Sequence, residues 1–296
     1  MSALDELLAS DTANVGNSQK AFLGFDQGLP TAFDTAAEMF ITFIRCMERS
    51  MDESEEREIL CRCAAELGVT HDELIEKVET AGGSGDSGVL ARARKAYVRV
   101  RARRAQLIIF LLLQRHYLWG VTDLLRMRVT PAEGYRRLEA EAVGLLILIR
   151  DEPSLGDSWL KIRTVDEGRQ FFNLTQAKLR ETLRSLNLDS AYEQGSGVAQ
   201  HVRVASAVLG LSWSEEQARL ACQEVRTDDP FSYILGSLAF LVTQVHVFHA
   251  LTVAFPHVTD PIWHTRVELF HNQVARLWKR LEERFPDECK AAGEGE

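Results

Sequence analysis

Apolar residues recur along most of the chain at intervals of three and four, which is the spacing of one face of an α-helix. The clearest case begins at Pro261, where the apolar positions are Trp263, Val267, Phe270, Val274, Leu277, Trp278, Leu281 and Phe285. An alternation with a period of two, which would indicate a strand, is confined to residues 97–101, inside an Arg/Ala-rich run that favours helix. The pattern therefore predicts an all-α protein, a helical bundle.

Prolines and capping residues divide this pattern into separate helices. All seven prolines fall between the apolar runs, where a residue without an N–H interrupts no helix. A Ser or Thr followed three residues later by Glu or Gln, the spacing of a capping box, occurs at Thr70, Thr130, Thr164 and Ser214. The helices predicted in this way span residues 31–50, 52–67, 70–80, 89–128, 131–150, 164–187, 197–210, 214–225, 231–255 and 261–285.

The composition of one interior segment suggests how the bundle is organised. Residues 81–88 read Ala-Gly-Gly-Ser-Gly-Asp-Ser-Gly, which is typical of a flexible linker. They divide a small N-terminal helical segment, residues 1–80, from a main helical bundle, residues 89–296. The first 30 or so residues and the last ten are expected to be frayed.

The net charge and the cysteines limit the partners and the cellular compartment that we expect for this chain. The formal net charge of -9 argues against nucleic acid and anionic lipid as partners. The five cysteines include no pair separated by two residues, which argues against a disulfide framework and a zinc knuckle, and favours the reducing cytoplasm.

Residues 231–255 contain no Asp, Glu, Lys or Arg and are long enough to span a bilayer. They include Gln244 and two histidines, and no basic cluster flanks them, so we expect a buried bundle helix there and no membrane association.

Five of the eight histidines lie between residues 246 and 271, on the last two long predicted helices. His246 and His249 are one turn apart on the first of these helices. His264, Glu268 and His271 follow one side of the second. If the two helices form an antiparallel hairpin, equal rise along both arms places His246 level with His271, and His249 level with Glu268.

Two interpretations of this histidine cluster stay open. His246, His249, Glu268 and His271 together supply a ligand set that suits a divalent transition metal held in the core of a bundle. Alternatively, the same groups hydrogen-bond to one another and form a polar seam between the helices. A divalent transition metal is the only cofactor that the sequence suggests. Because only one Glu-x-x-His pair is present, a ferritin-like di-iron site is not supported.

A second candidate is a basic helical face at the start of the predicted helix 89–128. Arg92, Lys95, Arg99 and Arg103 share this face, which would suit a phosphate or another anion. The acidic run at residues 52–58 is an internal partner for the same charges. Given the acidic net charge, we expect ion pairing within the chain and no nucleic-acid binding.

Two further groups of polar residues are close in sequence. Arg137 and Glu141 are one turn apart on the predicted helix 131–150, the spacing of an ion pair. Tyr192, Ser196 and His201 surround a glycine-broken turn, where Ser196 is also well placed to cap a helix.

The stretch from Tyr192 to His201, of the form Tyr-x-x-x-Ser-x-x-x-x-His, and the all-helical plan resemble the HEPN-like bacterial proteins. Ribonuclease members of that family carry an arginine and a histidine separated by four residues in a late helix, and they act as dimers. Arg266 and His271 have this spacing. The resemblance implies that His271 acts as a general base and that Arg266 stabilises charge on a phosphate.

For every candidate group of residues, a purely structural role explains the spacing at least as well as a catalytic role. The sequence therefore favours a helical binding or regulatory protein over an enzyme. The expected partner is another protein or a second copy of the chain. The alternative function is that of a hydrolase, either metal-dependent through the histidines of residues 246–271 or a HEPN-like ribonuclease.

Overall fold

The computed structural model describes residues 16–17, 19–50, 52–80, 88–193, 230–258 and 261–293, and over these residues it contains helices and turns but no strand. The predicted all-α fold is therefore confirmed. The helices are α2 (Gly28–Ser50), α3 (Ser54–Leu67), α4 (His71–Thr80), α5 (Gly88–Leu125), α6 (Val129–Asp151), α7 (Ser154–Leu160), α8 (Val165–Ser185), α11 (Pro230–Ala254), α12 (Pro261–Arg284) and α13 (Pro286–Gly293).

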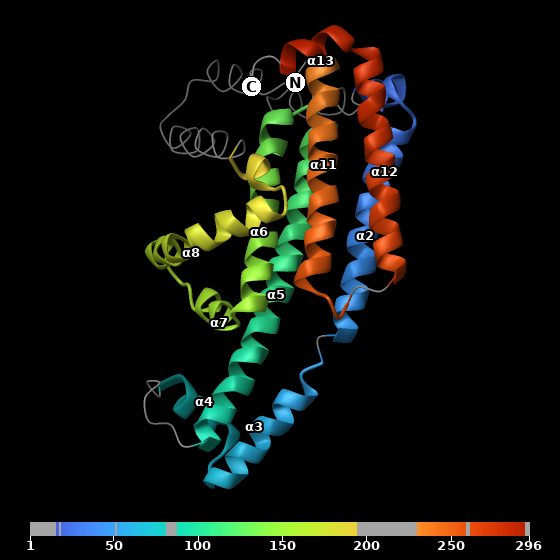
Figure 1. Cartoon of the computed structure of the whole chain (residues 1–296). Coiled ribbons are helices and arrows are strands. Elements are labelled where there is room, and N and C mark those ends of the chain that lie inside the picture. Colours follow the sequence, from blue (N-terminus) through green and yellow to red (C-terminus); the bar gives the residue numbers. More distant parts are fainter. Residues whose placement is uncertain are drawn as a thin grey trace, which may run out of the picture.

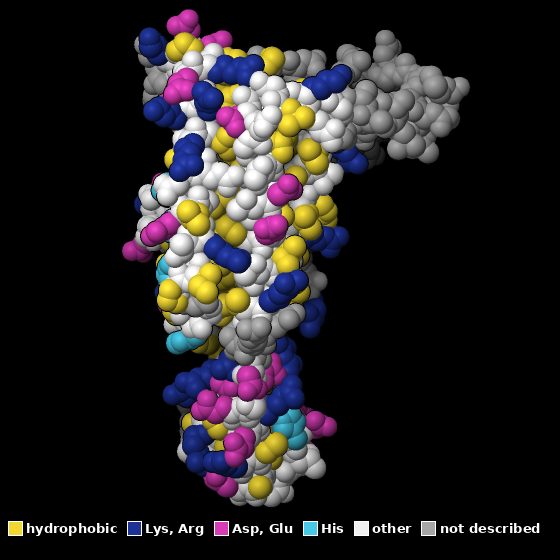
Figure 2. All heavy atoms as spheres, turned by 90° about the vertical axis from the view of Figure 1, so that its right-hand side faces the viewer, with side chains coloured by type: hydrophobic (Ala, Val, Ile, Leu, Met, Phe, Trp, Pro, Cys, Tyr) yellow, Lys and Arg dark blue, Asp and Glu magenta, His cyan; other side chains and the backbone are white. Residues whose placement is uncertain are grey.

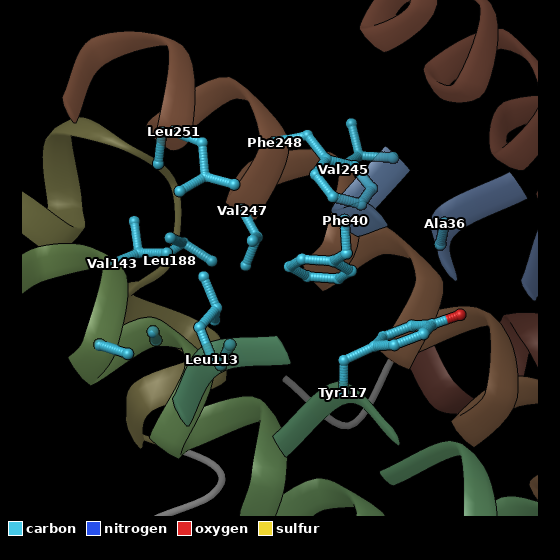
Figure 3. Packing of buried hydrophobic residues seen from close by; sticks show 14 of the residues in the cluster. Ala36, Phe40, Leu113, Tyr117, Val143, Leu188, Val245, Val247, Phe248 and Leu251 are labelled. Atoms are coloured by element: carbon cyan, nitrogen blue, oxygen red, sulfur yellow. The ribbon is translucent and has the colours of Figure 1, made fainter. Parts of the chain in front are cut away.

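Five long helices lie side by side and form an elongated bundle, with α5 and α6 next to α11, and α12 against α2 (Figure 1). Aromatic side chains from three of them meet in the core. The ring of Phe40 on α2 lies 5.1 Å from that of Tyr117 on α5 and 5.0 Å from that of Phe248 on α11, measured between centroids (Figure 3). Burial of such large apolar surfaces is the main term that holds a bundle together.

The helix α11 is the most apolar of the bundle and packs against α6, α12 and α2. Among the described residues it is the one helix long and apolar enough to cross a membrane, and most of its apolar stretch is buried inside the protein. The core helix of a soluble bundle has these properties, because it must be apolar on every side.

A second, smaller core lies at the far end of the molecule, where α3 and α4 pack against the first turns of α5 (Figure 1). It consists of Leu60, Cys63, Ala64, Leu74, Val78, Ala93 and Ala96. The helix α5 runs without a break for 38 residues from this core into the main bundle. Lys and Arg side chains are interspersed with Asp and Glu on this end of the molecule (Figure 2).

These two cores divide the chain differently from the predicted boundary between residues 1–80 and 89–296. The helix α2 belongs to the main bundle, because its apolar face, including Phe33 and Phe43, is buried against α5, α11 and α12. Only α3 and α4 form the separate N-terminal part, and they share their core with the start of α5. Of the predicted linker, Gly88 begins α5 and residues 81–87 lie outside the described residues.

The remaining differences concern short helices and chain ends. Neither α7, with seven residues, nor α13, with eight, was predicted, because each is too short for a helical period to show. Near the N-terminus, Phe22 is buried and its ring stacks on that of Tyr233 at 5.3 Å, so residues 19–25 are helical and not frayed. The predicted helices 197–210 and 214–225 lie outside the described residues.

Candidate functional site

The helices α11 and α12 form the predicted antiparallel hairpin and contact each other along its length. Near the connection, Trp263 Nε1 donates a hydrogen bond to Thr252 Oγ1 at 3.0 Å. Further along, the rings of Phe248 and Phe270 lie 5.5 Å apart. The His249 and His271 rings meet edge to face at 6.1 Å, so the partner of His271 is His249 and not His246, which the equal-rise argument had placed level with it.

This histidine cluster lies on the outer edge of the hairpin and not between the helices. His246 is half-buried, whereas His249, Glu268 and His271 are exposed, because Phe248, Phe270 and Val267 occupy the interior. Burial lowers the pKa of His246, and the nearby His249 and His271 lower it further. The pKa of His249 is also lowered, first by burial and then by His271, while Glu268 opposes the shift.

Metal binding requires ligand atoms that converge on one centre. Within the described parts of the chain, no group of three or more His, Cys, Asp or Glu side chains is arranged to hold a metal ion. The predicted set of His246, His249, Glu268 and His271 therefore does not form a metal site in this structure. Nor do hydrogen bonds among the described side chains join these four groups into the alternative polar seam, since three of the four are exposed to solvent.

The pair taken from the HEPN-like resemblance lies on two sides of α12. Arg266 Nη1 donates a hydrogen bond to Thr42 Oγ1 of α2 at 3.1 Å. His271 contacts His249 of α11, on the other side. Residues five positions apart are about 140° apart around a helix with 3.6 residues per turn, so Arg266 and His271 do not converge within one chain. Of the residues that carry the resemblance, Ser196 and His201 lie outside the described residues.

The basic face of α5 is partly neutralised by α3, as the acidic run predicted. Arg103 Nη1 lies 2.6 Å from Glu56 Oε2 and also donates to the Asp52 carbonyl oxygen at 2.7 Å. Arg92 pairs with Glu66 at 2.6 Å. Lys95 and Arg99 have no ion-pair partner among the described residues, and they line a shallow hollow of about 250 Å³.

A larger cleft opens between α6 and α8, with a volume of about 610 Å³. The two helices touch closely where Leu179 of α8 packs on Gly144 of α6, since a Cβ added at that glycine would lie 2.4 Å from a Leu179 methyl group. Away from this crossing point α8 projects outward from the bundle (Figure 1). The divergence of the two helices opens the cleft, and α7 lies beyond it.

The start of α8 is fixed by a capping box that the sequence predicted. Thr164 Oγ1 accepts a hydrogen bond from the Glu167 N–H at 3.2 Å, and the Glu167 carboxylate accepts one from the Thr164 N–H at 3.0 Å. The N–H groups of Arg163 and Thr164 lower the pKa of Glu167, which stays ionised as a cap. The first three turns of α8, which line the cleft, therefore have a defined beginning.

The cleft combines a polar wall with an apolar floor. Val165, Phe172 and Leu179 supply the apolar surface, and Val165 is 74% exposed. The polar side chains around it are Arg137, Glu141, Arg169, Asn173, Gln176 and Tyr192. A concave surface of this size with a few converging polar groups is the usual form of a small-molecule site.

Two arginines give the cleft its positive charge. Arg137 Nε donates to Glu141 Oε1 at 3.1 Å, and its guanidinium carbon lies 5.0 Å from the centre of the Tyr192 ring. This ion pair and the cation–π contact hold Arg137 in place. Arg169 pairs with Asp166 at 3.3 Å through side chains that are 74% and 83% exposed, so its charge remains accessible.

Sequence reasoning identified parts of this cleft but not the cleft itself. It named the Arg137–Glu141 ion pair and, separately, Tyr192, and the structure brings these three residues together. Arg169, Asn173 and Gln176 were missed. The available signal was the solvent-facing side of the predicted helix 164–187, where arginine and amide side chains recur at helical spacing beside Phe172.

The fold and cleft define an all-α bundle with a candidate small-molecule site. Comparisons of the chain with protein-family models, with curated proteins and with solved structures give no match.

Proposed function

We propose that this chain is a helical binding protein of the cytoplasm that takes a small organic anion in the α6–α8 cleft. The observation that carries the proposal is the arrangement of Arg137 and Arg169 at the rim of an apolar surface made by Phe172 and Leu179. An anionic group would pair with the guanidinium groups, which bind carboxylates and phosphates through two parallel hydrogen bonds. The amides of Asn173 and Gln176 would orient the rest of the molecule.

The placement in the cytoplasm rests on the cysteines. Cys46, Cys61, Cys63 and Cys289 are all free thiols in the described part of the chain. Unpaired cysteines of this number are typical of a reducing compartment.

A thermal-shift screen with small carboxylates and organic phosphates tests the ligand proposal. A ligand that binds only the folded protein raises its melting temperature with concentration. We expect a hit that loses its effect in Arg169→Ala, and also at high salt, because the contact is electrostatic. Arg180→Ala is the matched control, since Arg180 is an exposed arginine of α8 outside the cleft. Screening without a hit, or a hit that Arg169→Ala leaves unchanged, would reject the site.

The exposed face of α5 supports the second part of the functional proposal, which is a protein partner. Ile108, Leu111, Leu112, Leu118 and Trp119 are each between 37% and 52% exposed, and they recur at the three-four spacing of a helix–helix seam. Contiguous apolar surface of this kind marks interaction sites.

The partner that this face fits best is a second copy of the chain. Its leucines and Trp119 lie symmetrically about Arg115, with Leu111 and Leu112 before it and Leu118 and Trp119 after it. Two α5 helices packed antiparallel about a twofold axis would therefore place Leu112 of each chain against Leu118 of the other. The Arg115 guanidinium lies 4.4 Å over its own Trp119 ring, which moves its charge away from such an axis.

A further inference from the structure

Four polar side chains interrupt the apolar contact between α6 and α11. Glu139 and Gln244 are completely buried, Thr243 is 2% exposed, and Arg136 is 7% exposed. A carboxyl group is rarely found without solvent unless something specific holds it there. The groups that surround Glu139 therefore decide its protonation state.

Glu139 and Gln244 share one hydrogen bond and each leave one oxygen without a partner. Gln244 Nε2 donates to Glu139 Oε2 at 2.7 Å. Glu139 Oε1 and Gln244 Oε1 are buried and accept no hydrogen bond from any described group. With an ionised carboxylate both oxygens are acceptors only, so neither can satisfy the other.

The hydrogen bonds that the neighbouring groups donate go to other acceptors. On α6, Arg136 Nε donates to Thr243 Oγ1 at 2.8 Å and its Nη1 donates to Glu133 Oε2 at 2.5 Å. On α5, the Tyr117 hydroxyl donates to the Phe33 carbonyl oxygen at 2.6 Å. The field of Glu139 adds to burial in raising the pKa of Tyr117, and Asp34 of α2 acts in the same direction. Arg136 is the one cation whose charge lowers the pKa of Glu139, and neither of its two hydrogen bonds goes to that carboxyl group.

We propose that Glu139 keeps its proton in the folded protein at neutral pH, and that this proton joins Glu139 Oε1 to Gln244 Oε1. The carboxylic acid and the amide then exchange two hydrogen bonds, and the two orphaned oxygens satisfy each other. The pair fastens α6 to α11 in the middle of the bundle. Loss of the proton would leave two oxygens without a donor and a buried negative charge, so the contact between the two helices is sensitive to pH.

The pKa of Glu139 agrees with this arrangement. Burial raises it to about 8, against the opposing effects of the hydrogen bond from Gln244 and the charge of Arg136. The ordinary value for glutamate is 4.5. Between these two values the folded chain holds one proton that the unfolded chain has released. The folded-to-unfolded ratio therefore falls about tenfold for each pH unit across this window and levels off above about pH 8.

Urea unfolding of the full chain and of Glu139→Gln, compared from about pH 5 to about pH 9, tests the proposal. The variant keeps an amide that pairs with Gln244 but cannot titrate. The ratio of the two unfolding constants should change by about tenfold per pH unit below about pH 8 and become constant above it. Glu181→Gln, which changes an exposed glutamate of α8, should keep the pH dependence of the wild type.

A second measurement needs no variant, in case Glu139→Gln fails to fold. Carbon-13 NMR of glutamate side-chain carboxyls in the folded wild type should show one resonance that titrates near pH 8, well above the ordinary value of 4.5. If every resolved glutamate titrates below about pH 6, Glu139 is ionised in the folded chain at neutral pH, and the proposal is overturned. So does a ratio of unfolding constants that does not change with pH.

Discussion

Gly120 of α5 faces the ring of Phe240 on α11, and it shows how tightly single residues constrain this bundle. A Cβ added there would lie 2.4 Å from the ring of Phe240, which is completely buried. The ring has no free space to move into, because interiors of proteins are close-packed. The absence of a side chain at residue 120 therefore makes room for the Phe240 ring.

Gly120→Ala should destabilise the fold by about 1–3 kcal/mol, the usual cost of overpacking a core. Gly134→Ala is the matched control on α6, where no atom lies within 4 Å of the added Cβ. That variant should gain up to about 1 kcal/mol from the better helix propensity of alanine. Urea unfolding of both variants gives the comparison, and equal effects at the two glycines would contradict the packing described here.

The capping boxes predicted from the sequence agree with the structure only where the threonine directly precedes the first turn of its helix. The boxes predicted at Thr70 and Thr164 are formed, because each threonine precedes the first turn of its helix and exchanges hydrogen bonds with the glutamate three residues on. The box predicted at Thr130 is wrong, since α6 already begins at Val129 and the Glu133 carboxylate accepts from Arg136 instead. The box predicted at Ser214 lies outside the described residues.

At the scale of elements, the contact of α3 with α5 combines an apolar core with an ion pair whose carboxylate is buried. Glu56 is 1% exposed and lies 2.6 Å from Arg103. Removing one member of a buried pair leaves a charge without compensation, which is more damaging than losing an exposed pair.

Arg103→Ala should therefore destabilise the α3–α5 contact by about 2–4 kcal/mol, a figure reduced for the partial exposure of Arg103. Arg92→Ala, which breaks the exposed pair with Glu66, should cost less than about 1 kcal/mol. Hydrogen exchange of the α3 amides measures both effects. Adding Glu56→Gln to Arg103→Ala should restore part of the lost protection. A pair of arginine variants with the same exchange rates would show that the burial of Glu56 has no energetic consequence.

The hairpin and the cleft differ in how far sequence could predict them. Helical rise and a short connection predicted that the histidines of α11 and α12 come near one another, but they predicted His246 level with His271, whereas the ring contact in the structure joins His249 to His271. The equal-rise argument gives the level of a residue along the hairpin but not the direction of its side chain. His249 and His271 are exposed because Phe248 and Phe270 fill the interior. The α6–α8 cleft depends on the close approach of the two helices at Gly144 and on the angle between them. The hydrophobic periodicity of the sequence predicts neither of these. Likewise, nothing in the spacing pairs Glu139 with Gln244, which are 105 residues apart.

For the whole molecule, the exposed face of α5 predicts a dimer. Light scattering coupled to size-exclusion chromatography should give twice the chain mass of 33.3 kDa. Leu118→Glu should give the monomer, because a charge placed against Leu112 of the other chain would have to be buried among apolar side chains. Leu174→Glu, at an 82% exposed leucine of α8 outside this face, should leave the dimer intact. A monomer in the wild type, or a dimer that survives Leu118→Glu, would exclude this interface.

Ligand binding in the α6–α8 cleft is the central functional proposal, and titration calorimetry tests it most directly. With the anion that gives the largest thermal shift, wild type and Arg180→Ala should bind equally. The dissociation constant of Arg169→Ala should be about 10–100-fold higher, which corresponds to the loss of one charged hydrogen-bonded contact of about 1.5–3 kcal/mol. Equal dissociation constants for wild type and Arg169→Ala would contradict a binding site between α6 and α8.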